Sequence, residues 1–139
     1  MTLKMDAAAL EAFLRSDFDQ VADAFGVVSA DDEKLVVRLR VSNQHLRPGG
    51  TVSGPTMFGL ADVSVYLAIL ARIGPVGLAV TTNCSIDFMR KPVANCDLIS
   101  ETRILKLGKV LAVGDTLIYS EGDPKPVARA SLTYSIPPR

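Results

Sequence analysis

A single carboxylate stands in the middle of a long apolar stretch of this sequence. Residues 49–72 read GGTVSGPTMFGLADVSVYLAILAR, and Asp62 is the one acidic residue among them. An unpaired carboxylate is costly to bury, so Asp62 must have hydrogen-bond partners or lie in a solvated pocket. Such a group can act as a general base toward water or as a nucleophile toward a carbonyl carbon. Asp62 is therefore the first candidate for catalysis.

Gly54 and Pro55 precede the apolar run and are typical of the start of a helix. Proline suits the first helical turn, and Ser53 or Gly54 can serve as the cap. The first N–H groups of a helix lack intrahelical acceptors and lie at the positive end of the helix dipole. They can stabilise the negative charge that develops on a carbonyl oxygen under attack. Because glycine has no side chain, Gly54 also lets a substrate carbonyl come close to the backbone.

The spacing of these two residues limits how they can cooperate. Gly54 and Asp62 are eight residues apart on one predicted helix, residues 54–72, which separates them by about 12 Å along the axis. Groups that act on one carbon must lie about 3–3.5 Å from it. One chain therefore cannot bring both to one carbonyl, whereas antiparallel helices from two copies can. The spacing predicts an obligate homodimer, or a homotetramer built from such dimers, with its sites at the interface.

The rest of the sequence predicts the elements that position these residues. Apolar residues recur at three- and four-residue steps over residues 6–25, which predicts an amphipathic helix with Asp6 as N-cap and Gly26 as its stop. Residues 42–53 form a loop rich in Gly, Pro, Ser and Asn. Alternation of apolar and polar residues predicts six strands. They are expected over residues 27–30, 34–41, 78–91, 97–106, 109–120 and 126–136.

These elements predict an α+β fold in a single domain, residues 1–139. Several connections are short enough for hairpins, so the sheet should be mostly antiparallel. The helix over residues 54–72 is apolar nearly all round and must be covered on most sides. A curved sheet wrapped around one long central helix, with a further helix at the N-terminus, satisfies this requirement. That arrangement is the hotdog fold.

The segment HLRPGGTVSGPTMFGLADVSVYLA resembles the signature of the PaaI-type hotdog acyl-CoA thioesterases. Their pattern runs His-x-Asn-x-x-Gly-x-x-His-Gly-Gly and continues, six residues later, to an Asp that is usually part of Leu-Ala-Asp. His45, Gly50, Gly54 and residues 60–62 match it. The segments CSIDFMRKP and LKLGKVLAV also resemble the family, and the likeness covers about residues 35–136. It implies a thioesterase in which Asp62 is the general base or nucleophile and Gly54 polarises the thioester carbonyl.

Three positions depart from the pattern. Arg47 replaces the family's Asn, Ser53 replaces the second His, and Pro55 replaces the last Gly and has no N–H to donate. These departures keep a second possibility open, a protein that binds acyl-CoA or another small ligand without catalysis. A hydratase is a third, although hotdog hydratases pair the Asp with a nearby helix-region His that this sequence lacks.

The resemblance also implies a substrate-binding set. His45, Arg47 and Ser53 occupy positions of the motif loop, and Tyr66 lies one turn after Asp62, where it could wall the acyl pocket. Thr81, or Thr82 if the alignment slips by one, matches a hydroxyl residue that helps to position water. The positions at which the family meets coenzyme A are Arg90, Lys91, Gly108 and Lys109.

Composition argues against other partners. The 15 basic and 15 acidic residues balance at a net charge of 0, and without a basic stripe nucleic-acid binding has no electrostatic support. The apolar helix is long enough to cross a membrane, but a charge such as Asp62 at the bilayer centre costs about 2.5–3.5 kcal/mol. We expect this helix to be buried inside the domain instead.

Metal and triad chemistry lack the necessary residues. His45 is the one histidine, and no cluster has the spacing of metal ligands. We therefore expect no metal and no cofactor, with coenzyme A entering as part of the substrate. Cys84 and Cys96, together with an N-terminus that lacks the apolar core of a secretory signal, predict reduced, mainly structural thiols in a cytoplasmic protein.

Overall fold

The computed structural model describes residues 3–138 of the 139-residue chain. Helices α1 (Ala7–Asp17) and α2 (Asp19–Ala22) lead into strands β1 (Phe25–Ala30) and β2 (Leu35–Leu39). A short 3-10 helix, η1 (Asn43–His45), precedes the long helix α3 (Gly54–Ile73). The last four elements are β3 (Val80–Phe88), β4 (Leu98–Leu107), β5 (Leu111–Ser120) and β6 (Ala128–Ser135). The central helix and the six predicted strands are confirmed in the predicted order.

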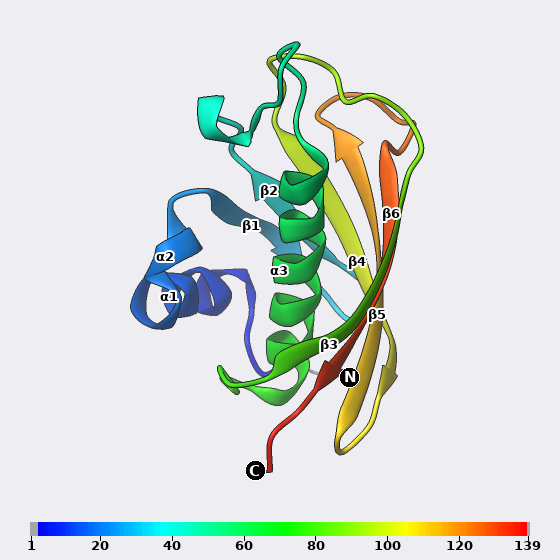
Figure 1. Cartoon of the computed structure of the whole chain (residues 1–139). Coiled ribbons are helices and arrows are strands. Elements are labelled where there is room, and N and C mark those ends of the chain that lie inside the picture. Colours follow the sequence, from blue (N-terminus) through cyan, green and yellow to red (C-terminus); the bar gives the residue numbers. More distant parts are fainter. Residues whose placement is uncertain (1–2, 139) are drawn as a thin grey trace.

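All six strands form one sheet, in the order β1-β2-β4-β5-β6-β3, and every neighbouring pair is antiparallel. The sheet curves around α3, which lies against its concave side (Figure 1). Strands β4, β5 and β6 follow one another through hairpins, whereas β3 lies beside β6 at one edge of the sheet. The predicted α+β hotdog architecture is thus confirmed.

Helix α3 forms the centre of the hydrophobic core, because its own side chains are apolar around most of its circumference and most of them are buried. Leu60 and Leu67 are fully buried, as is the polar Ser64 on the side that faces β4. Ser64 is satisfied by Ser100 of β4, whose hydroxyl oxygen lies 2.6 Å from its own. The helix ends at Gly74, whose φ of 95° is a conformation that glycine adopts without strain.

By length and composition alone, α3 would also qualify as a membrane-spanning helix. Most of its residues are nevertheless buried inside the domain, against the concave face of the sheet. A core helix of a globular domain has the same composition when it is covered on most sides. The prediction that residues 54–72 are buried inside the domain is confirmed.

The prediction of one N-terminal helix over residues 6–25 is wrong in its second half. Asp6 caps α1 as expected, accepting a hydrogen bond from the Ala9 N–H. The helix breaks at Phe18, and the chain enters strand β1 at Phe25, so Gly26 lies within a strand and does not end a helix. Packing explains the difference, because apolar residues at helical spacing can also be buried when the chain turns at Phe18 and pairs with β2.

A small residue on β5 lets the sheet approach the central helix. A Cβ atom added at Gly114 would lie 3.0 Å from Val65 Cγ1 of α3 and 3.3 Å from the carbonyl oxygen of Arg103 on β4. Neither neighbour can retreat freely, because Val65 is fully buried and the other atom belongs to the backbone of the sheet.

We therefore predict that Gly114→Ala lowers the free energy of unfolding by about 1–3 kcal/mol, the usual cost of overpacking a core. Denaturant unfolding measures the difference. Ser131→Ala, on the neighbouring strand but facing away from α3, is the matched control and should change stability by less than about 0.5 kcal/mol. Equal unfolding midpoints for the two variants would show that β5 does not approach α3 this closely.

Candidate active site

Asp62 lies half-buried near the middle of α3 and is held by hydroxyl groups from two strands. Tyr134 of β6 donates a hydrogen bond to Asp62 Oδ1 at 2.7 Å, and its hydroxyl oxygen also lies 2.9 Å from the Asp62 carbonyl oxygen. Thr81 of β3 donates to the same oxygen, Oδ1. The carboxylate therefore has the partners that burial requires, and both come from side chains on the concave face of the sheet.

The choice between the two threonines of β3 is settled by the register of the strand. Thr81 pairs with Tyr134 and faces α3, whereas the hydroxyl of Thr82 donates to the carbonyl oxygen of Thr133. The register shifts between Thr81 and Asn83, so the simple alternation of faces does not hold through this part of β3. The prediction that Thr81 rather than Thr82 belongs to the site agrees with this geometry.

Aromatic rings surround the base of the site. Burial, and then the negative charge of Asp62, raise the pKa of Tyr134 well above its ordinary value, so its hydroxyl remains a neutral donor at physiological pH. Tyr66, one turn after Asp62, is also buried and donates to the carbonyl oxygen of Gly77 at 2.9 Å. Its ring centroid lies 6.1 Å from that of Tyr134 and 5.8 Å from that of Phe18, which it meets edge-on.

A cavity of about 560 Å³ opens beside Asp62. Tyr66 and Tyr134 form part of its wall, and the region of the break between α1 and α2 contributes Phe18 and two polar residues, Asp17 and Gln20. A volume of this size falls in the range of small-molecule sites. The cavity combines the Asp62 carboxylate with aromatic side chains and with small or aliphatic residues such as Ala79 and Val80.

The first turn of α3 retains one backbone donor. Ser53 is the N-cap, and its hydroxyl oxygen accepts a hydrogen bond from the Thr56 N–H at 3.3 Å. The Met57 N–H donates to the Ser53 carbonyl at 3.1 Å, and Pro55 has no N–H at all. Among residues 3–138 no acceptor is assigned to the Gly54 N–H, so this group remains available to a ligand at the positive end of the helix.

The loop over residues 42–53, which carries the family motif, is hydrogen-bonded to the start of α3 through its backbone. The carbonyl oxygen of His45 accepts from the Ser53 N–H at 2.9 Å and from the Thr56 hydroxyl at 3.3 Å. The His45 ring accepts from the Ser42 N–H at 2.9 Å. These contacts give His45 a structural role, and Ser53 likewise acts as a cap. Arg47 lies on a turn with its side chain exposed, and a role for these three residues in substrate binding stays a prediction.

The residues expected to bind coenzyme A divide between the two ends of the sheet. Arg90 and Lys91 follow the end of β3 at Phe88, close to the start of α3. Gly108 and Lys109 form the hairpin between β4 and β5, near the opposite end of the sheet. At that end Ser135 of β6 pairs with Leu111 of β5 and with Val80 of β3. Strand β3, with 9 residues, spans about 30 Å. One chain therefore does not bring Arg90 and Lys91 together with Gly108 and Lys109.

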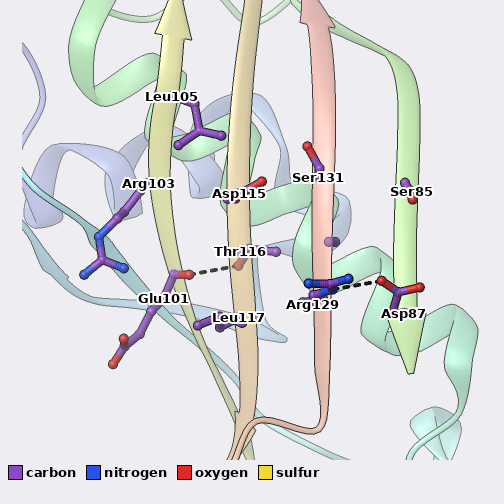
Figure 2. Close-up of a pocket in the computed structure, with 11 residues that line it drawn as sticks. Ser85, Asp87, Glu101, Arg103, Leu105, Asp115, Thr116, Leu117, Arg129 and Ser131 are labelled. Carbon is purple, nitrogen blue, oxygen red and sulfur yellow. Dashed lines mark hydrogen bonds and ion pairs between the residues drawn. The ribbon is translucent and has the colours of Figure 1, made fainter. Parts of the chain in front are cut away.

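A second hollow, of about 430 Å³, lies on the outer face of the sheet, away from α3. Figure 2 shows its lining, in which Arg129 forms an ion pair with Asp87 at 2.9 Å. Both side chains are largely exposed, and the hollow includes neither Asp62 nor Gly54. An exposed ion pair is worth little energetically. Because this hollow also lacks Asp62 and Gly54, it is not the candidate active site.

Two further chemistries, metal ligation and thiol attack, can be compared with the residues around the site. Across residues 3–138, no group of three or more His, Cys, Asp or Glu side chains is arranged to hold a metal ion. Cys84 and Cys96 are both free thiols. Burial, followed by the nearby Asp62, raises the pKa of Cys84, so this thiol is protonated and weakly nucleophilic at neutral pH.

Two residues of the site were not identified from the sequence. Tyr134 falls in the strand predicted over residues 126–136, but the contact of its hydroxyl with Asp62 depends on how β6 crosses α3. Phe18 falls in the helix predicted over residues 6–25, and only the break after α1 brings it to the cavity. An inward-facing Tyr on a strand is a weak signal, but it does require a buried partner for its hydroxyl.

Known proteins resemble this chain in sequence and in fold. The family model described as the thioesterase superfamily matches residues 49–127. A crystal structure from Silicibacter sp. TM1040 with a thioesterase designation has a TM-score of 0.92 and 54% identity, covering 99% of this chain and 96% of its own.

Two relatives are similar in sequence over most of their length. Acyl-coenzyme A thioesterase 13 of Mus musculus is 29% identical over 117 residues, which cover 84% of this chain and 82% of the relative. Acyl-coenzyme A thioesterase PaaI of Escherichia coli K12 is 31% identical over 106 residues, covering 74% and 73%.

Proposed function

The chain belongs to the thioesterase superfamily and is a thioester hydrolase, and from this premise we propose that it hydrolyses acyl-CoA at a site shared by two subunits. The observation that carries the proposal is the arrangement on α3. A hydroxyl-held carboxylate lines a cavity of about 560 Å³, and the single free N–H of the helix start lies two turns away.

The two groups supply the two requirements of thioester hydrolysis. As general base, Asp62 takes a proton from water while the water oxygen attacks the thioester carbon, and the carbonyl oxygen becomes an oxyanion held by the Gly54 N–H. The C–S bond then breaks, and the departing thiolate of coenzyme A takes up the proton. If the carboxylate attacks directly instead, the C–S bond breaks, the coenzyme A thiolate leaves and a mixed anhydride forms, which water hydrolyses to the free acid and the Asp62 carboxylate. Gly54 has the same role in both routes.

Self-association would bring the two groups together, and the exposed surfaces support it. Along α3, Phe58 lies one turn before Asp62 and is 38% exposed. A Cβ added at Gly59 meets nothing within 4 Å, so another helix can approach closely here. Strand β3 forms an uncovered edge with exposed Val80 and other apolar residues. Such an edge is a template for pairing with another chain.

A twofold axis perpendicular to the sheet, between two adjoining β3 strands, makes the two strands antiparallel. The partner's Val80 end then adjoins the end of β3 that leads to Arg90 in this subunit. The Gly108 hairpin of the partner would lie toward the same end, with the partner's Asp62 facing this subunit's Gly54. Basic groups from both subunits, Arg90, Lys91 and the partner's Lys109, could then contact the phosphates of one coenzyme A. The homodimer, or a homotetramer of two such dimers, is thus the form in which we propose that the enzyme works.

The first test is thiol release from a panel of short-, medium-, long-chain and aryl acyl-CoA substrates. We predict that at least one is hydrolysed, and that Asp62→Asn lowers its turnover by about 10²–10⁴-fold because the amide cannot accept the proton. Asn keeps the shape and the acceptor oxygen for Thr81 and Tyr134. The matched control is Asp115→Asn on the outer face of the sheet, which should remain active.

Three outcomes would contradict this account. Inert substrates together with measurable coenzyme A binding would favour a non-catalytic binding protein. Hydration of an alkene without thiol release would indicate a hydratase. Full turnover by Asp62→Asn would remove this residue from the chemistry.

A second prediction concerns the Gly54 N–H. Gly54→Pro deletes this donor, and Ser53, at φ −76° and ψ 156°, already has the extended backbone that a following proline requires. We expect the variant to fold, because proline is favoured in the first helical turn. Its kcat should fall by about 10²–10³-fold, the usual loss when one oxyanion donor is removed.

Gly54→Ala is the matched control for the added bulk. It keeps the N–H, and its Cβ would lie 3.3 Å from the ring of Phe88, a half-exposed side chain that can shift. The difference in kcat between Gly54→Pro and Gly54→Ala then measures the contribution of the residue 54 N–H to turnover. Equal activities would mean that the Gly54 N–H does not bind the oxyanion.

A further inference from the structure

Both hydroxyl donors to Asp62 reach the same carboxylate oxygen. Tyr134 donates to Oδ1 at 2.7 Å, and Thr81 donates to Oδ1 from the opposite strand of the β3–β6 pair. Among the described residues, 3–138, none is assigned a hydrogen bond to Oδ2. The two oxygens of one carboxylate, which are equivalent in solution, are therefore distinguished by the fold.

Resting on the proposed function, we propose that Tyr134 is a positioning residue which, together with Thr81, fixes Oδ1 of Asp62 and leaves Oδ2 as the oxygen that reacts. A carboxylate without anchors turns about its Cβ–Cγ bond and exchanges its oxygens. Two donors on one oxygen suppress this rotation and hold the other oxygen in one direction. Neither hydroxyl needs to touch the substrate to have this effect.

The surroundings of Tyr134 suit such a role. Its side chain is only 3% exposed, and its ring packs against Tyr66, so the hydroxyl cannot swing away. The second acceptor within reach, the carbonyl oxygen of Asp62 at 2.9 Å, belongs to the same residue. Burial and the charge of Asp62 raise the pKa of Tyr134, which keeps it a donor while Asp62 is ionised. Tyr134 thus ties β6 to both the backbone and the side chain of the proposed base.

Removing an anchor should impair catalysis more than binding. Tyr134→Phe keeps the ring and its packing but deletes the hydroxyl, and we expect kcat to fall by about 10²-fold, because small misplacements of a reacting group have effects of that size. KM and inhibition by free coenzyme A should change little, since neither hydroxyl belongs to the nucleotide site. A general loss of folding would instead lower the amount of active enzyme, which titration of binding sites with coenzyme A measures separately.

Thr81 provides a test that does not depend on the core. It lies near the beginning of an edge strand and is only partly buried, so Thr81→Val and Thr81→Ser should both fold. Thr81→Val should lose kcat, whereas Thr81→Ser, which retains a hydroxyl, should recover most of it. The double variant Tyr134→Phe/Thr81→Val should differ from the sum of the single effects, because the two residues act on one group.

The outcomes separate this inference from the proposed function. If the wild-type protein releases thiol but Tyr134→Phe and Thr81→Val keep wild-type kcat, the positioning role is wrong while the thioesterase proposal stands. If kcat falls while KM stays constant and Thr81→Ser restores it, the role is supported. If Thr81→Ser is as impaired as Thr81→Val, the methyl packing rather than the hydroxyl matters, which also overturns the inference. A wild-type protein that hydrolyses no acyl-CoA would refute the proposed function itself.

Discussion

The site depends on one rigid object, the helix α3. Its 20 residues are packed against the concave side of the sheet along most of their length, so the helix cannot bend to bring its first turn toward its middle. The axial rise of a helix, about 1.5 Å per residue, then keeps Gly54 and Asp62 about 12 Å apart along the helix axis. A reaction that needs both at one carbon must recruit them from two molecules.

The curved sheet supports this helix in two different ways. On its closed side, inward-facing residues of β4 and β5 bury the apolar surface, and Ser64 is paired with Ser100. On the side of β6 and β3, two hydroxyl groups meet Asp62 and make a half-buried charge tolerable. The same wrapping leaves a stripe of α3 and the edge of β3 uncovered. The candidate site thus lies next to the surface that the fold leaves uncovered, with Asp62 half-buried against β3 and β6.

Much of this could be predicted from the sequence, because the strongest signals are local. Ser53, Pro55 and Gly74 mark the ends of the central helix almost to the residue, and alternating side chains located all six strands. The N-terminal helix was predicted too long, because the spacing of Phe18 and Phe25 satisfies a helix as well as the turn and strand that form. Periodicity alone does not distinguish them, and tertiary packing decides.

The contacts of the site could be predicted less well, since they are made between distant segments. Thr81 was predicted with Thr82 as the alternative because the family alignment could slip by one residue, and the register shift in β3 is not visible in the sequence. The hydroxyl of Tyr134 meets Asp62 across 72 residues of chain, at an angle that only the curvature of the sheet determines. His45 matched the motif, with a structural and a substrate-lining role both open. Its carbonyl oxygen joins the loop to the helix start, and its contact with substrate stays a prediction.

The central claim, a site shared between two subunits, is tested most directly by mixing two inactive proteins. Asp62→Asn and Gly54→Pro homodimers each lack one required group in both sites, but a heterodimer contains one site with both groups intact. After subunit exchange, equal amounts should regain about a quarter of wild-type activity, since half of the dimers are mixed and each has one working site. If exchange is verified by separately tagged subunits and the mixture remains inactive, both groups act within one chain, and the account is wrong.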